Sequence, residues 1–162
     1  MKRSSAIVVF VVLFGAAAIA QGRAVSPSKE RLLGAWNLVS FTSFDANGAS
    51  RPGAYDVGRI HYDAAGQMSA QLMHSSNKSD KTPATDEERS AAYRRYLGYY
   101  GPFTVDESSG TVTHHVIGSS NPSWVGSRQV RYFTLSDDGN RLTLAVKNNG
   151  RVTSTLVWER VR

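Results

Sequence analysis

Short stretches in which apolar and polar residues alternate recur along most of the chain, and they constrain the fold more than any other feature. Alternation with a period of two is typical of β-strands, whose successive side chains point to opposite faces. Turn residues separate the stretches, and Asn149-Gly150 is the clearest hairpin signal among them. Eight strands are predicted, at residues 31–44, 57–62, 67–74, 103–106, 111–118, 129–135, 142–146 and 152–161.

A meander of eight antiparallel strands can close on itself, which removes the exposed edges of the sheet. We therefore predict an all-β fold, an eight-stranded antiparallel up-and-down β-barrel with one inserted α-helix. An open sandwich is the structural alternative. The interior of an eight-stranded barrel is either filled by side chains or holds one small ligand.

The first predicted strand carries a conspicuous tryptophan. A turn of helix is expected at residues 31–34, and the alternation begins at Trp36. Trp36 would then plug one end of the barrel. The period of two places Trp36, Leu38, Ser40 and Thr42 on one face, and Val39 and Phe41 on the other.

One helix is predicted after the polar segment 75–84. Thr85 and Glu88 have the spacing of a capping box. After this cap, five residues fall at helical spacing on one face of the predicted helix, and Gly98 and Gly101 mark the end of the helix. These residues are Ala92, Tyr93, Tyr96, Leu97 and Tyr100. We expect this helix to lie across one end of the barrel as a lid.

The first twenty residues have the layout of a secretory signal peptide. Lys2 and Arg3 precede the uncharged, largely apolar run 6–20, which ends in the small-x-small sequence Ala18-Ile19-Ala20. This run is shorter than the roughly 20 residues of a membrane-spanning helix, so no stable membrane span is expected after cleavage. Cleavage is expected after Ala20, with Ala24 as the alternative. The protein would then be periplasmic or secreted.

The rest of the chain is predicted to be one domain. Residues 1–20 are assigned to the signal peptide, 21–30 to a flexible lead-in, and 31–162 to the barrel. Removing Lys2 and Arg3 from the 19 basic residues leaves 17 against 13 acidic ones. These basic residues are scattered, and nucleic-acid binding needs them clustered on one face, so no nucleic-acid partner is expected. The oligomeric state is left open.

Sequence signals for a cofactor or a metal are missing. The chain contains no cysteine and no nucleophile-elbow, Walker or H-E-x-x-H motif, so neither thiol chemistry nor a cofactor is expected. Adjacent strand residues face opposite ways, so His114 and His115 cannot chelate one ion. We therefore expect no metal site.

Residues on the inward faces of the strands are the candidates for ligand binding. His114 shares a face with Val112 and Val116, so we expect it to point into the barrel. Arg131 would select an anionic ligand if it faced inward, and would be a solvated residue if it faced outward. The predicted cavity residues are Met68, Leu72, His114, Tyr132 and Leu144, with Tyr96 and Trp124 near the mouth.

Several motifs resemble, in order, those of the lipocalin-like domain proteins, a family of small bacterial and fungal calycin-type barrels. They are LLGAWNLVS at 32–40, GQMSAQLM at 66–73, the long segment 96–126, RLTL at 141–144 and LVWERV at 156–161. Gly34-Ala35-Trp36 is similar to the G-x-W signature of such barrels, in which an arginine from the last strand lies over the tryptophan. The resemblance implies that role for Arg160. It leaves the activity open, because a fold alone does not give a function.

Three functions are compatible with such a barrel. The first is binding of a small hydrophobic or amphipathic molecule in the cavity. The alternative is a cofactor-free enzyme, a cyclase, isomerase or hydratase that uses His114 as a base with a tyrosine or Gln71 as partner, and it requires His114 to face a solvent-reachable cavity. The third is a solid-core interaction module, for which we expect a filled interior.

Overall fold

A computed structural model describes residues 28–162 of the chain. The predicted signal peptide and both possible cleavage points lie outside the described residues. The helices are α1 (Ser28–Leu32) and α2 (Asp86–Arg94), with the 3-10 turns η1 (Ser75–Asn77) and η2 (Pro122–Trp124). Helix α1 begins at Ser28, within the segment that we assigned to a flexible lead-in.

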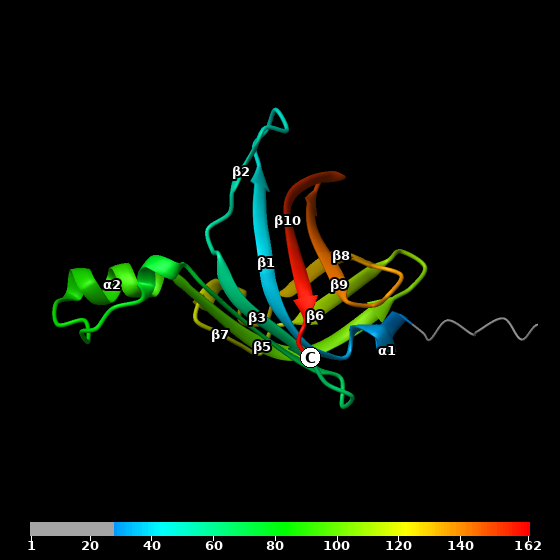
Figure 1. Ribbon diagram of the computed structural model, residues 1–162, viewed down its shortest axis with the longest axis horizontal. Coiled ribbons are helices and arrows are strands. Elements are labelled where there is room, and N and C mark those ends of the chain that lie inside the picture. Colours follow the sequence, from blue (N-terminus) through cyan, green and yellow to red (C-terminus); the bar gives the residue numbers. More distant parts are fainter. Residues whose placement is uncertain (1–27) are drawn as a thin grey trace, which may run out of the picture.

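Strands make up most of the described chain (Figure 1). They are β1 (Gly34–Phe44), β2 (Ser50–Pro52), β3 (Val57–Tyr62), β4 (Gln67–Met73), β5 (Tyr96–Asp106), β6 (Thr111–His115), β7 (Gly118–Ser119), β8 (Arg128–Leu135), β9 (Arg141–Asn148) and β10 (Arg151–Arg160).

Eight of these strands close into a barrel. The sheet runs β10-β9-β8-β6-β5-β4-β3-β1, and β10 also pairs with β1, so the ring has no gap. Every ladder is antiparallel, and the short strands β2 and β7 are side branches on β1 and β5. The predicted eight-stranded antiparallel barrel is confirmed, and closure excludes the open sandwich.

One end of the barrel is packed solid. Trp36, Tyr62 and Leu142 have essentially no exposed surface there, and Leu32 of α1 is equally buried. Helix α1 is held over this end, since the Trp36 indole N–H donates to the Leu32 carbonyl at 2.9 Å and Arg160 donates to the Arg31 carbonyl at 2.6 Å. The barrel therefore has one closed end, below α1.

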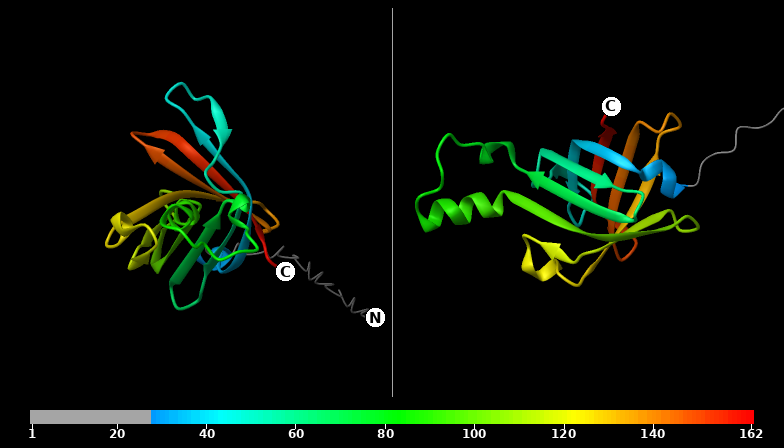
Figure 2. Two further views of the ribbon diagram at one scale, coloured as in Figure 1. Left: turned by 90° about the vertical axis from the view of Figure 1, so that its left-hand side faces the viewer. Right: turned by 90° about the horizontal axis from the view of Figure 1, so that it is seen from below.

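Helix α2 lies at the other end of the molecule. It projects away from the barrel, and the two helices stand on opposite sides of the barrel in Figure 1 and in the right-hand view of Figure 2. None of its residues is buried. None of the helices in residues 28–162 combines the length and apolar character that crossing a membrane requires.

The predicted helix is too long, because strand β5 begins at Tyr96 rather than near Phe103. In β5 the side chains of Leu97, Tyr99 and Phe103 alternate inward, while Tyr96 and Tyr100 are exposed. The same tyrosines that fit a helical spacing also fit a period of two. The ladder with β4, which pairs residues 96–102 with 67–73, decides for the strand.

A β-bulge changes the phase of β1. The register with β10 shifts between Leu38 and Ser40, so Val39 is the extra residue and is exposed. A bulge adds one residue to one strand and so exchanges the faces of those that follow. Phe41, predicted on the face opposite Trp36, therefore packs against the core.

The predicted strand 111–118 is interrupted. Strand β6 ends at His115, and β7 forms a separate bridge to β5. Between them, Val116 hydrogen bonds through both its backbone groups to residues 126 and 127. These two bonds join the end of the loop that carries Trp124 to the residue that follows β6, so this loop is held against the barrel.

Candidate ligand-binding site

A cavity of about 550 Å³ occupies the end of the barrel opposite α1. Its walls are mainly aromatic and aliphatic. Ile60, Leu72, Leu97, Tyr99, Leu144, Leu156 and Trp158 line its deeper part, and Phe41, Tyr55, Tyr93, Tyr96 and Trp124 come from the segments around its mouth. Phe41 and Tyr55 stack with their ring centroids 6.3 Å apart. The barrel is therefore hollow on one side, unlike a solid-core module.

Four of the seven predicted cavity residues line this cavity. Leu72 and Leu144 belong to its wall, and Tyr96 and Trp124 lie toward the mouth. Met68 faces inward but belongs to the packed core below the cavity, where it is 2% exposed. His114 also lies in the interior and does not line the cavity.

The prediction for Tyr132 is wrong, because this side chain faces outward. It is 36% exposed, and the Lys147 ammonium lies 3.8 Å from its ring centroid on the outer surface. Its neighbour Arg131 takes the inward position and is only 9% exposed. Strand β8 thus turns Val130 and Tyr132 to solvent and Gln129 and Arg131 toward the cavity, the reverse of the expected pattern.

His114 connects two buried tyrosines beneath the cavity. Its Nε2 shares a hydrogen bond of 2.8 Å with the Tyr62 hydroxyl, and its Nδ1 shares one of 3.0 Å with the Tyr99 hydroxyl. Tyr99 lines the cavity, whereas His114 and Tyr62 do not. Both imidazole nitrogens are therefore occupied, and Tyr99 is the member of this chain of hydrogen bonds that faces the cavity.

Burial controls the protonation of these three residues. It lowers the pKa of His114 from 6.5 to about 3, with smaller electrostatic contributions from the neighbouring Arg131 and His115 side chains. Burial also raises the pKa of Tyr62 well above its usual value and raises that of Tyr99, against an opposing effect of Arg131. At neutral pH the imidazole and both phenols are therefore neutral. The chain is an uncharged polar layer, not an acid–base pair in contact with the cavity.

Arg131 stands at the edge of this layer. Its guanidinium carbon lies 5.9 Å from the ring centroid of Trp124, and Trp124 meets Tyr99 edge-on with centroids 5.2 Å apart. One guanidinium nitrogen donates to the Val130 carbonyl at 2.9 Å, and the other donates to Gln129 Oε1 at 3.3 Å. The result is a fixed group of one cation and two aromatic rings on the cavity wall.

A model of the lipocalin-like domain family matches residues 33–161. The chain belongs to this family. The match spans the whole barrel, from the residue before β1 to the residue after β10. The resemblance of the quoted motifs is thus confirmed.

Two individual proteins are similar to this lipocalin-like chain. A 4'-hydroxy-3'-methoxypropiophenone carrier protein of Aspergillus oryzae is 37% identical over 81 residues, which is 44% of this chain and 73% of the relative. The solved structure of a redesigned β-barrel has a TM-score of 0.43 at 15% identity, over 83% of this chain and 95% of that one. The fold assignment itself rests on the strand pairing described above.

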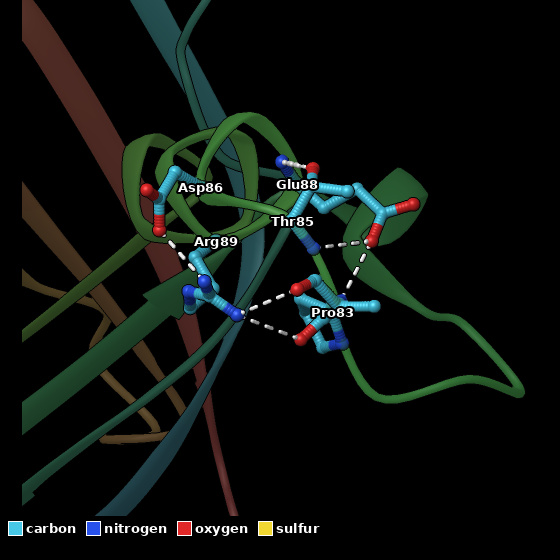
Figure 3. Close-up of polar contacts among 6 residues, drawn as sticks. Pro83, Thr85, Asp86, Glu88 and Arg89 are labelled. Atoms are coloured by element: carbon cyan, nitrogen blue, oxygen red, sulfur yellow. Dashed lines mark hydrogen bonds and ion pairs between the residues drawn. The ribbon is translucent and has the colours of Figure 1, made fainter.

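Helix α2 brings two further residues to the mouth of the lipocalin-like barrel. Tyr93 and Arg94, at its C-terminal end, line the cavity, and the Tyr93 hydroxyl donates to the Ser120 carbonyl. The N-terminal end is held by the predicted capping box (Figure 3), in which Glu88 N–H donates to Thr85 Oγ1 and Thr85 N–H donates to Glu88 Oε2. The helix is thus well formed locally although it buries no side chain.

Arg89 makes further contacts at the N-terminal end of α2. It donates to the Pro83 carbonyl and forms an exposed ion pair of 2.7 Å with Asp86 (Figure 3). Exposed pairs of this kind contribute little to stability. The lid position that we predicted for the whole helix applies only to its last turn, since the first turns extend away from the barrel (Figure 1).

Sequence reasoning missed several lining residues. Phe41 was placed on the wrong face because nothing in the sequence marks the bulge at Val39. Tyr55 lies in a loop that carries no periodicity. Tyr99 was not among the candidates because it lies between Gly98 and Gly101, where the helix was predicted to end, although the alternation of Leu97, Tyr99 and Phe103 with smaller or exposed residues was a usable signal for a strand.

Proposed function

We propose that this protein binds a small, partly apolar molecule in the open end of its barrel. The observation that carries the proposal is the cavity of about 550 Å³ with its mainly apolar wall. Ligand pockets generally have volumes of roughly 300–1,000 Å³, apolar linings and a few placed polar groups. The polar groups of the wall include those of Tyr99, Gln129, Arg131, Ser154 and the loop residues Ser120 and Asn121, and Arg94 and further tyrosine hydroxyls lie toward the mouth.

Aromatic side chains narrow the class of ligand that we propose. Tyr55, Tyr93, Tyr96 and Trp124 surround the mouth, and Tyr99 and Trp158 lie deeper. Rings of this kind favour flat ligands through offset stacking and edge-to-face contacts. The name of the fungal relative describes a carrier of an aryl ketone with hydroxyl and methoxy groups. We infer that an oxygen-substituted aromatic molecule occupies this cavity as well.

Binding is a better proposal than catalysis by His114. The catalytic alternative needs the imidazole at a solvent-reachable cavity, and His114 is fully buried behind Tyr99. With a pKa of about 3, it would also be a weak base.

Export is part of the same proposal and has its own support in the sequence. Lys2, Arg3 and the apolar run that follows them favour passage through a secretory route. The intact mass of the protein from a culture medium or periplasmic extract tests this. Loss of residues 1–20 or 1–24 supports export, and a full-length protein retained in the cytoplasm contradicts it.

The binding proposal is tested by calorimetric titration with 4'-hydroxy-3'-methoxypropiophenone and by native mass spectrometry of the purified protein. We expect one molecule bound per chain. Leu144→Trp is the matched variant, because it fills the cavity from a wall position that is 2% exposed, and it should abolish the signal. Absence of binding to the ketone and of any co-purified organic molecule overturns the proposal.

A further inference from the structure

The cavity carries positive charge without a negative counterpart. Arg131 lines its wall and Arg94 its mouth, whereas no Asp or Glu among residues 28–162 lines it. The ionisable groups beside them are tyrosines. A ligand in this cavity therefore meets cations, phenols and apolar surface only.

Arg131 is buried without a carboxylate partner. Within residues 28–162 the ion pair between Arg89 and Asp86 is the one salt bridge, and it lies on the far helix. The bonds to Val130 and Gln129 use two of the five N–H groups of the guanidinium. The side chain is 9% exposed, and among residues 28–162 only the Tyr99 hydroxyl offers it a further side-chain contact, one that lowers the pKa of Tyr99 against the larger effect of burial. No carboxylate reaches the N–H groups that remain.

The strand that carries Arg131 is built for this position. Strands normally turn apolar residues to the core and polar residues to water, and departures from this pattern are expected at functional sites. In β8, Val130 and Tyr132 are 42% and 36% exposed, while Gln129 and Arg131 face the cavity. Gln129 and Arg131 thus occupy interior positions in which Val130 and Tyr132 would cost less desolvation free energy.

Neighbouring groups hold the guanidinium in place before any ligand arrives. Gln129 accepts from Arg131 and donates through its own amide to Ser127 Oγ at 2.9 Å, which fixes the Gln129 side chain. Trp124 covers one side at 5.9 Å. Because the arrangement is preorganised, little conformational entropy is lost when a ligand binds.

The hydrogen-bond partners that Arg131 needs depend on whether the cavity holds water or a ligand. Water in the open cavity can hydrate its free N–H groups, and a ligand that enters displaces this water. A wholly neutral, apolar ligand would leave a buried cation uncompensated, which is costly. An anionic oxygen would restore both charge balance and hydrogen bonds, and the planar guanidinium is suited to bind a carboxylate in two-point fashion.

We propose that Arg131 is the recognition site for an anionic oxygen, and that the ligand is a small aromatic acid whose carboxylate lies against Arg131, Gln129 and Trp124. The proposal rests on the proposed function, since it names the ligand class for the same cavity. Arg94 at the mouth adds attraction for an anion without contributing to its final position.

A matched pair of probes tests the proposal without any mutation. The probes are 4-hydroxy-3-methoxybenzoate and its methyl ester, which differ in the negative charge and hardly in size. Calorimetric titration at neutral pH should show the acid binding roughly tenfold or more tightly than the ester, the range for hydrogen bonds to charged groups. Equal affinity for the two overturns the proposal.

Variants test whether Arg131 is the residue that causes the preference for the acid over the ester. Arg131→Gln should weaken binding of the acid by roughly 10- to 100-fold and leave the ester nearly unchanged. Arg131→Lys keeps the charge but not the planar fork, and should retain part of the preference for the acid. Lys147→Gln is the control, because it removes a cation from the outer face beside Tyr132 and should change neither affinity.

Failures of the two proposals are distinguishable. If the ketone and both probes fail to bind the wild-type protein, the proposed function is wrong, and this inference with it. If the neutral ketone and the ester bind as well as the acid, binding stands and anion recognition fails. An Arg131→Gln variant that loses acid and ester equally shows a structural role for Arg131, which also overturns the inference.

Discussion

The guanidinium carbon of Arg160 lies 4.0 Å from the ring centroid of Trp36, and the two residues face each other across the seam between the first and last strands of the barrel. Arg160 also donates to the carbonyls of Leu33, Arg31 and Gly139, at 2.7, 2.6 and 2.8 Å. One side chain thus joins β10 to the segment of α1 and to the β8–β9 turn. This contact closes the end of the barrel that has no cavity.

Trp36→Ala should therefore lower the free energy of unfolding by roughly 3–5 kcal/mol, the usual cost of removing a fully buried aromatic side chain. The variant loses the packing of the ring, the bond from its indole N–H to the Leu32 carbonyl, and the cover of Arg160. Urea unfolding followed by circular dichroism measures the change. Val39→Ala on the same strand, 47% exposed, is the control and should be nearly neutral. An unchanged midpoint for Trp36→Ala contradicts the closure role.

The barrel was predictable because its strands repeat one physical pattern. Alternation, hairpin turns and closure all point to the same fold, and Trp36 and Arg160 occupy the places that the family resemblance implies. The boundary between α2 and β5 was not predictable in the same way, because Tyr96 and Tyr100, four residues apart, fit both the helical spacing and a period of two. Pairing of β5 with β4 settles that choice, and it is a long-range interaction.

The candidate site was predictable only where the strand pattern is ordinary. Leu72 and Leu144 alternate with polar residues and line the cavity as expected. In β8 we predicted that Tyr132 faces inward because apolar residues usually do. The inward-facing positions are instead those of Gln129 and Arg131. The bulge at Val39 likewise reversed the face of Phe41. Both departures lie at the cavity, where function competes with packing.

Gly101→Ala tests the packing of β5 against the C-terminal end of β6. A Cβ at this position would lie 1.9 Å from the carbonyl oxygen of His115, which is backbone and cannot move aside alone. We expect a loss of roughly 2 kcal/mol or more in unfolding free energy, as in other overpacked interiors. Gly48→Ala is the comparison, because a Cβ there would meet nothing within 4 Å and only its positive φ of 85° opposes alanine, at a cost of roughly 1 kcal/mol. Equal midpoints in urea would show that the two segments do not approach so closely.

Burial of neutral His114 predicts a pH dependence of stability with a definite sign. The pKa is 6.5 for the ordinary group and about 3 in the folded protein, so only the unfolded chain takes up a proton between these values. Stability must therefore fall as the pH drops below 6.5, by roughly 1 kcal/mol per pH unit. Asp106 and Asp138, whose pKa values are lowered to about 2, affect stability only below about pH 4.

His114→Gln should remove the slope between pH 6.5 and about 4.5, because glutamine does not titrate. Urea unfolding at a series of pH values measures it. The variant should also be less stable at neutral pH, since its amide cannot reproduce both tyrosine contacts. His61→Gln, at an exposed position on β3, is the control and should keep the slope. A wild-type protein without a slope in this range would exclude a buried, uncharged His114.

Trp124→Ala separates binding from stability. The side chain lines the cavity and meets Tyr99 edge-on, yet it lies in the short turn η2 outside the barrel ladders. We expect affinity for the aryl ketone to fall roughly tenfold, as for loss of an aromatic anchor, with a smaller effect on unfolding than that of Trp36→Ala. Calorimetric titration and urea unfolding of the same samples give both values. Val125→Ala, the 52% exposed neighbour, should change neither. If Trp124→Ala binds the ketone as tightly as the wild type, the ligand does not contact this wall, and the cavity mouth must be assigned to other residues.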